Sequence, residues 1–357
     1  NIWTAKIKVG DKTEIIGLKF EGDGKEETNN GNGYFVEMTG KDGKATLGAR
    51  VGRATAFSLW GYYIGADRDA NKAYEMMSGI FRTNPELKSK YMSDYLTSIS
   101  GALKDKGNDL ISEELTGFQS NKNLTEDDLT LIYSWYSRIK NTGKAEEVKK
   151  EILAKYPAGK IAVSERLKAV TAEKDFAKKM ELLAQVEKDF PGNDIIKSAV
   201  QNLFYGMQRE GKFNEGKELA EKYSEMIPSF YYGYYVSAIL KSNKNIEEAL
   251  YFGEKGASLA RKELANPVDK KPKTMTDKNW LEMRKSNLGR ALSSYGNALS
   301  ALNKNTEAAA AYEEAVKNIP ADDMEPSILE KYAQALVATN QNEKAVAKIE
   351  EAITSGM

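Results

Sequence analysis

A run of aromatic residues is the feature of this sequence best suited to binding: Phe230-Tyr231-Tyr232-Gly233-Tyr234-Tyr235. On a helix, consecutive side chains point about 100° apart, so these rings cannot all face one core. Some must be exposed or line a groove. Tyr and Arg often dominate binding interfaces, and a patch of Tyr205, Tyr231, Tyr234 and Arg209 can hold an extended peptide or a sugar. Alternatively, the tyrosines pack between helices with their hydroxyls at the surface.

Catalysis has little support in the sequence. It contains no His and no Cys, which removes the commonest general base, the commonest transition-metal ligand and thiol chemistry. Gly31-Asn32-Gly33 lacks the G-x-G-x-x-G spacing of a nucleotide loop, and G-x-S-x-G is absent. Adjacent carboxylates, as in Glu146-Glu147 and Glu313-Glu314, have Lys nearby and are typical of solvated helix faces. We predict a protein that is not an enzyme, with no cofactor, catalytic residue or metal ligand.

Composition and charge narrow the classes of partner. Of the 357 residues, 41% are hydrophobic and 29% charged, as in globular proteins. Lys plus Arg and Asp plus Glu both number 52, which gives no electrostatic reason to expect nucleic acid or an anionic membrane. No apolar stretch approaches the roughly 18 residues of a membrane span. The chain begins without Met, inside a predicted strand, as expected of a mature or trimmed chain.

Residues 1–46 alternate in the period of β-strands. Residues 2–9, with Trp3 and Ala5 among their apolar positions, predict a first strand. Residues 16–20 predict a second, paired with the first in a hairpin, and residues 34–36 a third. Residues 21–33 are expected to be a polar loop. Its oxygen-bearing side chains suit Ca²⁺, but their spacing matches no EF-hand, which favours an ordinary solvated loop; they are Asp23, Glu26, Glu27, Asn29 and Asn30.

Residues 47–357 carry apolar residues in the helical period of 3.6. Helical pairs of similar size recur, about eight in all, and many end at a Pro that blocks further helix. One such pair contains Leu292, Tyr295, Gly296, Leu299, Ala308, Tyr312 and Pro320, and another contains Phe57, Trp60, Gly61, Ile64, Ala73, Met77 and Pro85. Small residues let helix backbones approach, and no single pair can bury its apolar face alone. A helix from Asn279 to Asn303 is expected, capped by Asp277.

The spacing of these residues resembles the tetratricopeptide repeat family. The resemblance implies a mostly α fold, a right-handed α-α superhelix with a small N-terminal β segment. It also implies a concave groove lined by the first helix of each pair, where the protein binds a peptide or protein segment. Carried onto this sequence, the groove positions are Ser58, Tyr62, Arg138, Gln201, Tyr205, Arg209, Tyr231, Tyr234, Lys241, Ser293, Asn297 and Gln334.

The N-terminal part has a second resemblance. Trp3 in a predicted strand, Asn29-Asn30-Gly31-Asn32-Gly33-Tyr34, a Gly-Lys-Asp-Gly turn and Leu47-Gly48-Ala49 resemble exported Bacteroidetes-type proteins, in which a β-sandwich and helical repeats precede a thioredoxin-like domain. That resemblance implies a periplasmic or cell-surface lipoprotein acting beside thiol–disulfide chemistry, with the redox domain beyond Met357.

The sequence therefore predicts a non-enzymatic, extracytoplasmic scaffold that binds a peptide or protein segment in its groove. Two alternatives remain: a glycan-binding accessory protein, and the substrate-holding region of a thioredoxin-like oxidoreductase. The sequence does not identify the partner.

Overall fold

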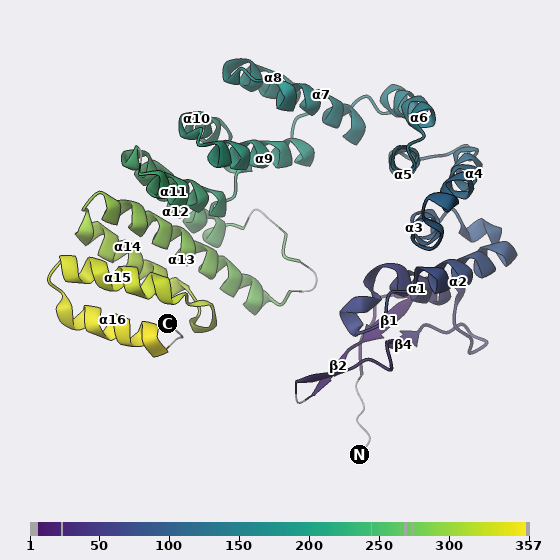
Figure 1. The fold of residues 1–357 in the computed structure, drawn as a ribbon, viewed down its shortest axis with the longest axis horizontal. Coiled ribbons are helices and arrows are strands. Elements are labelled where there is room, and N and C mark those ends of the chain that lie inside the picture. The colour runs from purple at the N-terminus through teal and green to yellow at the C-terminus, as the bar shows by residue number, and fades with distance from the viewer. Residues whose placement is uncertain (1–5, 23, 244, 268–269, 273–274, 355–357) are drawn as a thin grey trace. The chain divides into compact units, whose positions relative to one another are not determined.

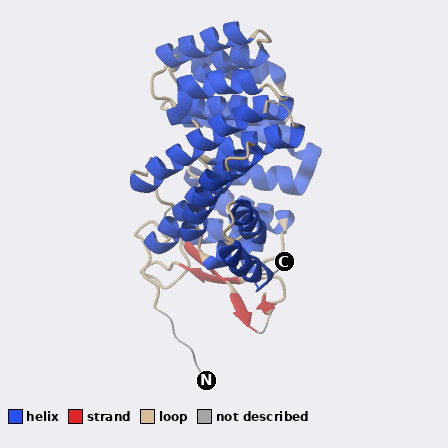
Figure 2. Ribbon diagram, turned by 90° about the vertical axis from the view of Figure 1, so that its left-hand side faces the viewer, coloured by secondary structure: helices blue, strands red, loops and turns tan. Residues whose placement is uncertain are grey.

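The structure is a computed structural model, and it describes residues 6–22, 24–243, 245–267, 270–272 and 275–354. The protein is mostly α-helical with a small N-terminal β segment, as predicted. Strands, red in Figure 2, are confined to residues before Leu47 among those described. Two compact units make up the chain, residues 1–161 and residues 162–357, and each is treated by itself.

The β segment consists of two small antiparallel pairs. Strand β1 (Ile15–Leu18) pairs with β4 (Tyr34–Glu37), so that Ile15 lies opposite Glu37 and Leu18 opposite Tyr34. Strand β2 (Phe20–Gly22) pairs with β3 (Lys25–Glu27). Strands of three or four residues bury little area by themselves, so the segment depends on the helix beside it.

Three sequence predictions for this segment need correction or restriction. Trp3 and Ala5 lie outside the described residues, and residues 6–10 form no strand. Ile7 is 58% exposed, so this stretch has no buried face to hold a strand. The predicted hairpin is therefore wrong, because β1 pairs with β4 instead. Residues 21–33 are not all loop, since they include β3 and the end of β2.

Helix α1 (Leu47–Thr55) supports the β segment. The Thr46 hydroxyl caps its N-terminus by accepting a hydrogen bond from the Ala49 amide at 3.1 Å. Phe35 of β4 packs against Phe57 and Trp60, with ring centroids 6.2 and 5.9 Å away. These two rings lie on a π-helical turn, η1 (Ala56–Trp60), which continues α1. A 3-10 turn, η2 (Gly61–Ile64), then ends the helix at Gly65, whose φ of 74° suits glycine.

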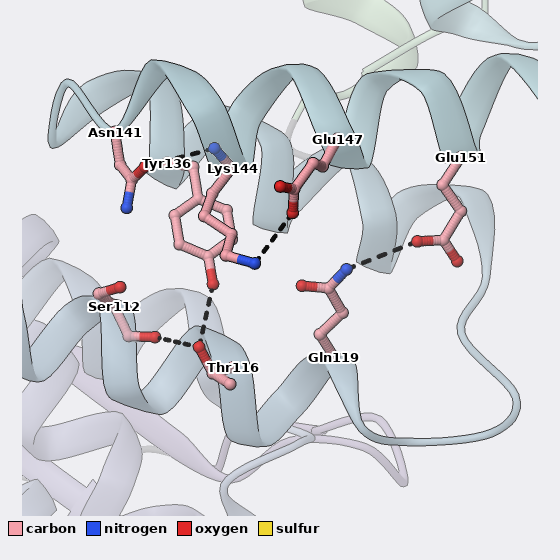
Figure 3. Close-up of polar contacts among 8 residues, drawn as sticks. All are labelled: Ser112, Thr116, Gln119, Tyr136, Asn141, Lys144, Glu147 and Glu151. Atoms are coloured by element: carbon pink, nitrogen blue, oxygen red, sulfur yellow. Dashed lines mark hydrogen bonds and ion pairs between the residues drawn. The ribbon is translucent and has the colours of Figure 1, made fainter.

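The rest of the first unit consists of helices joined by short connections. Their bounds are α2 (Ala70–Thr83), η3 (Pro85–Leu87), α3 (Met92–Leu103), η4 (Lys104–Gly107), α4 (Asn108–Gln119), α5 (Glu126–Arg138) and α6 (Thr142–Lys155). Figure 3 shows how polar contacts join α4 to the next pair: Thr116 and Tyr136 share a hydrogen bond of 3.2 Å, and Gln119 donates to Glu151 at 3.5 Å. Asn141 caps α6 by accepting from the Lys144 amide at 3.3 Å.

The second unit continues the alternation of paired helices, seen in order in Figure 1. Helix α7 begins just before the unit boundary. The bounds are α7 (Lys160–Ala172), α8 (Phe176–Asp189), α9 (Asp194–Glu210), α10 (Phe213–Tyr223), η5 (Ser224–Met226), α11 (Phe230–Ser242), α12 (Ile246–Ala265), α13 (Asp277–Ala301), α14 (Asn305–Asn318), η6 (Ala321–Asp323), α15 (Pro326–Ala338) and α16 (Asn342–Thr354).

From α11 onward each helix packs against the next along the chain. The predicted small and large residues meet as expected: a side chain on Gly296 would lie 2.8 Å from the ring of Tyr312. One detail differs from the prediction for α13. Thr276, not Asp277, is its N-cap and accepts from the Asn279 amide at 3.1 Å, while Asp277 is the first helical residue. Thr276 suits the N-cap as a hydrogen-bond acceptor, and the charge of Asp277 suits the positive end of the helix dipole.

Candidate binding site

The aromatic run divides between the core and the surface of α11. Tyr232 and Tyr235 are fully buried, Tyr231 is half-buried, and Phe230 and Tyr234 are each 47% exposed. This is the division that helical geometry requires, because positions 232 and 235 share one face while 230 and 234 share another. Packing between helices describes Tyr232 and Tyr235, whereas Tyr234 combines ring contacts to Tyr205 with a largely exposed side chain.

The two buried tyrosines hold α11 in place. Tyr235 lies between Phe204 of α9 and Phe252 of α12, with ring centroids 4.3 and 4.2 Å away. Its hydroxyl donates to the Phe204 carbonyl at 2.6 Å. Burial raises the pKa of Tyr235 and of Tyr232 well above the usual value for tyrosine. The exposed rings of the run are therefore carried by a helix whose rotation is fixed by its core.

Four rings gather on the exposed side of α9 and α11, and we call them the aromatic cluster: Tyr205, Phe230, Tyr231 and Tyr234. Tyr205, 41% exposed, has its centroid 6.3 Å from that of Tyr231 and 5.9 Å from that of Tyr234. Phe230 stacks on Tyr231 at 4.3 Å. The other ring pairs meet edge to face, at angles between 63° and 85°. The structure thus brings together three of the four tyrosines predicted for the groove, namely Tyr205, Tyr231 and Tyr234.

Arg209 lies beside the aromatic cluster, with its guanidinium carbon 6.0 Å from the centroid of Tyr205. It is exposed, and no acidic partner is found for it among the residues described. Gln201, also predicted for the groove, has a structural contact: its amide donates to the Met226 carbonyl at 2.8 Å. That bond ties α9 to the turn before α11.

A second feature is a cavity of about 500 Å³ bounded by α11, α13, α14 and α15. Two predicted groove residues, Asn297 and Gln334, line it. Asn297 accepts a hydrogen bond of 2.7 Å from Tyr312, whose pKa burial raises to about 12. The remaining lining residues are Ser237, Leu240, Ser300, Asn305, Lys331 and Ala335. The lining is thus rich in amides and hydroxyls, with one cationic group and no carboxylate.

The cavity and the aromatic cluster share α11. Ser237, which lines the cavity, follows Tyr234 by about one helical turn, or roughly 5 Å along the axis. A ligand in contact with Tyr234 can therefore reach the cavity without crossing the core.

Two other residues predicted for the groove do not line the cavity. Ser293 is buried, at 6% exposure, so its prediction is wrong. Ser293 is buried because it lies on the same face of α13 as Gly289 and Gly296, which pack closely against Ile319 and Tyr312. Lys241 is not among the residues that line the cavity.

The predicted groove residues of the first unit have local contacts. Tyr62, 43% exposed, lies between Tyr63 at 4.0 Å and the Arg68 guanidinium at 4.4 Å. Ser58 donates to the Thr55 carbonyl of its own helix at 3.1 Å. Arg138 lies over Trp135 at 4.8 Å. Each of these side chains has its contacts within its own helix or the turn that follows it.

The acidic groups considered for chemistry are engaged with neighbours. Glu147 pairs with Lys144 at 2.9 Å and Glu313 with Lys317 at 2.9 Å, all on exposed helix faces. In the candidate calcium loop, Glu27 accepts from the Asn29 amide at 2.8 Å, while Asp23 lies outside the described residues. Within the described ranges, no three acidic side chains are grouped as a metal site would require.

Sequence reasoning missed several lining residues. Lys331 precedes Gln334 by one turn of α15, and Ser300 follows Asn297 on α13. The three-residue spacing from Gln334 and from Asn297 could have identified Lys331 and Ser300 as lining residues, since residues three apart share a helix face. Asn305 was not predictable in this way, because it comes from the start of α14.

Comparison with known proteins leaves the family open. No family model matches the chain, and no curated protein matches it. None of the described helices is long and apolar enough to cross a membrane.

Proposed function

We propose that the second unit is a non-enzymatic scaffold that binds an extended peptide or protein segment over the aromatic cluster and the neighbouring cavity. The observation that carries the proposal is the aromatic cluster itself. Three rings between 41% and 47% exposed lie together on two neighbouring helices. Grouped exposed rings of this kind mark interaction sites more often than scattered ones.

Ring geometry favours a peptide over a sugar. A sugar ring stacks on an open aromatic face, and a platform for it needs faces that are flat and accessible. In the aromatic cluster Tyr231 and Tyr234 meet at 85°, and Phe230 stacks on Tyr231. Edge-to-face rings instead form uneven walls between which an apolar side chain can insert. The fixed rotation of α11 keeps those walls in place before a ligand binds, which limits the entropy lost on binding.

The cavity supplies polar contacts for the same ligand. An extended segment carries backbone amides and carbonyls that need partners once they leave water. Asn297, Gln334 and Ser300 offer both donors and acceptors for them. Lys331 adds a positive charge without an acidic neighbour in the lining, which favours a segment that presents a carboxylate or carbonyl oxygen there.

Selection from a random peptide library, followed by calorimetric titration, tests the proposal. Selected peptides should bind the full chain and lose affinity by about tenfold or more when Tyr234 or Tyr205 is replaced by Ala. Tyr63→Ala is the matched control, because Tyr63 is 66% exposed but lies in the first unit. Peptides that bind the Tyr234→Ala chain as tightly as the original would contradict the proposal.

A glycan array should be screened in parallel, because amides and hydroxyls of the kind that line the cavity also hydrogen-bond sugars. A glycan whose binding requires Tyr234, together with the absence of any selected peptide, would replace the peptide with a sugar as the ligand of this site.

A further inference from the structure

The helices of the second unit divide their acidic residues unevenly. The second helices of three pairs, α10, α12 and α14, hold three, four and three Glu. Helix α11 holds no Asp or Glu, and α13 has none after Glu282. Helix α11, which the aromatic cluster and the cavity share, therefore brings no negative charge to the site, and neither do the residues of α13 that line the cavity.

Three cationic side chains border the same surface: Arg209 of α9, Lys241 of α11 and Lys331 of α15. All three are exposed, and no ion pair to any of them is found among the residues that the structure describes. Lys241 follows Leu240, which lines the cavity, and Lys331 lines the cavity itself. The site thus gathers positive charge, although Lys plus Arg and Asp plus Glu are equal in number over the whole chain.

The acidic residues that adjoin these cations in the sequence have other partners. Glu210, next to Arg209, pairs with Lys212 at 2.6 Å. Glu330, next to Lys331, accepts a hydrogen bond of 3.1 Å from the side-chain amide of Gln334. Lys241 has no acidic neighbour in its helix. The two carboxylates and Lys212 together leave the site with a positive charge.

The cations lie at the two ends of the site. Helices α9, α11, α13 and α15 contact one another in this order. Arg209 is on the first of them and Lys331 on the last, with Tyr234 and Asn297 on the two between. Packed helices lie roughly 8–10 Å apart, so the three steps span roughly 25–30 Å. An extended segment covers that span in about eight residues, at ~3.3 Å per residue.

Building on the proposed peptide site, we infer that the bound segment is acidic. It places one Asp or Glu at Arg209, a second at Lys331 and Lys241, and an apolar side chain between them on the aromatic cluster. Guanidinium and ammonium groups bind carboxylates through charge-assisted hydrogen bonds. The rings supply most of the affinity, while the complementary charges speed association and select an acidic partner over a basic one.

Selection of peptides on the full chain from two random libraries tests the inference. One library has Asp and Glu as its only charged residues, and the other has only Lys and Arg. Binders should come from the acidic library and should lose about tenfold in affinity with Tyr234→Ala. Arg209→Gln and Lys331→Gln should each weaken them several-fold. Added salt should weaken binding to the original chain more than to these two variants, because it screens the charges that the variants lack.

An exchange of charges then identifies the partner of Lys331. Lys331→Glu should weaken an acidic binder by about tenfold or more, because like charges now face each other. Replacement of the matching acid of the peptide by Lys should restore its affinity for the Lys331→Glu chain. Lys188→Glu is the matched control, since Lys188 is equally exposed but lies on α8, and it should leave binding unchanged.

The outcomes separate the acidic partner from the peptide site itself. Binders from the basic library that require Tyr234 would overturn the acidic partner and leave the peptide site in place. Acidic binders that keep full affinity for the Arg209→Gln and Lys331→Gln chains would do the same. Absence from both libraries of any binder that requires Tyr234 would overturn the peptide site, and the acidic partner with it.

Discussion

The Tyr235 hydroxyl donates a hydrogen bond of 2.6 Å to the backbone carbonyl of Phe204, and so joins α11 to α9 inside the core. Tyr232, one turn earlier on the same helix, is equally buried, but its hydroxyl has no partner among the described residues. Two buried tyrosines on one helix face thus differ in whether the hydroxyl has a hydrogen-bond partner. That difference allows the contribution of the hydrogen bond to be measured against a matched neighbour.

We expect Tyr235→Phe to lower the free energy of unfolding by about 1 kcal/mol, the usual net contribution of a hydrogen bond. Tyr232→Phe should leave it unchanged or raise it, because a buried hydroxyl without a partner is removed. Urea denaturation followed by circular dichroism measures both. Equal losses in the two variants would show that the Phe204 bond contributes nothing specific.

Gly216 permits the close approach of α10 to Tyr235, whose ring is held between Phe204 and Phe252 and cannot move aside. Gly216→Ala should therefore destabilise the second unit by about 1–3 kcal/mol through overpacking. Gly206→Ala is the control, since a side chain there meets nothing within 4 Å. It should stabilise α9 by up to about 1 kcal/mol. Thermal melts of both variants give opposite shifts if the packing is as described.

Glu14 links the β segment to the start of α3 by accepting hydrogen bonds from Lys90 and from Tyr91, each at 2.6 Å. Burial by itself would raise the pKa of Glu14, but the hydrogen bonds from Lys90 and Tyr91 outweigh it and lower the pKa. A carboxyl with a lowered folded pKa stabilises the fold above its unfolded pKa, and this contribution is lost as the pH falls through the folded value.

Glu14→Gln should therefore reduce stability at about pH 7 and have a smaller effect at about pH 3. The loss should be below about 1 kcal/mol because the pair is partly exposed to solvent. Chemical denaturation at the two pH values measures the difference. A loss of stability that is independent of pH would show that the ionised form of the Glu14 carboxyl does not stabilise the fold.

Asn297→Ala and Lys331→Ala test whether a selected peptide extends from the aromatic cluster into the cavity. If it does, each variant should weaken binding by several-fold, and the effect of Lys331→Ala should shrink at high salt because its charge is screened. Calorimetric titration at two salt concentrations tests both points. Full affinity in both variants would confine the ligand to Tyr205, Phe230, Tyr231 and Tyr234.

The helical part of the fold was predictable because apolar spacing is a local property. Pro85, Pro157, Pro191 and Pro320 each follow a helix, as expected. The pairing of β1 with β4 was not predictable, because nothing in the alternation of residues 15–18 specifies which distant strand lies alongside. In the site, the sequence indicated that the run at 230–235 must divide. Helical spacing alone did not show which rings are buried, since Tyr occupies both faces of α11, but the repeat resemblance assigned Tyr231 and Tyr234 to the groove.

Aromatic residues join each of three helical pairs to the pair before it, as Tyr235 on Gly216, Tyr295 on Gly253 and Tyr332 near Tyr312 show. Cooperativity in such an array passes from neighbour to neighbour. When the second unit is pulled at its ends in an optical trap, we therefore expect it to lengthen in discrete steps, one or a few helices at a time. The order of rupture would rank the junctions by mechanical strength.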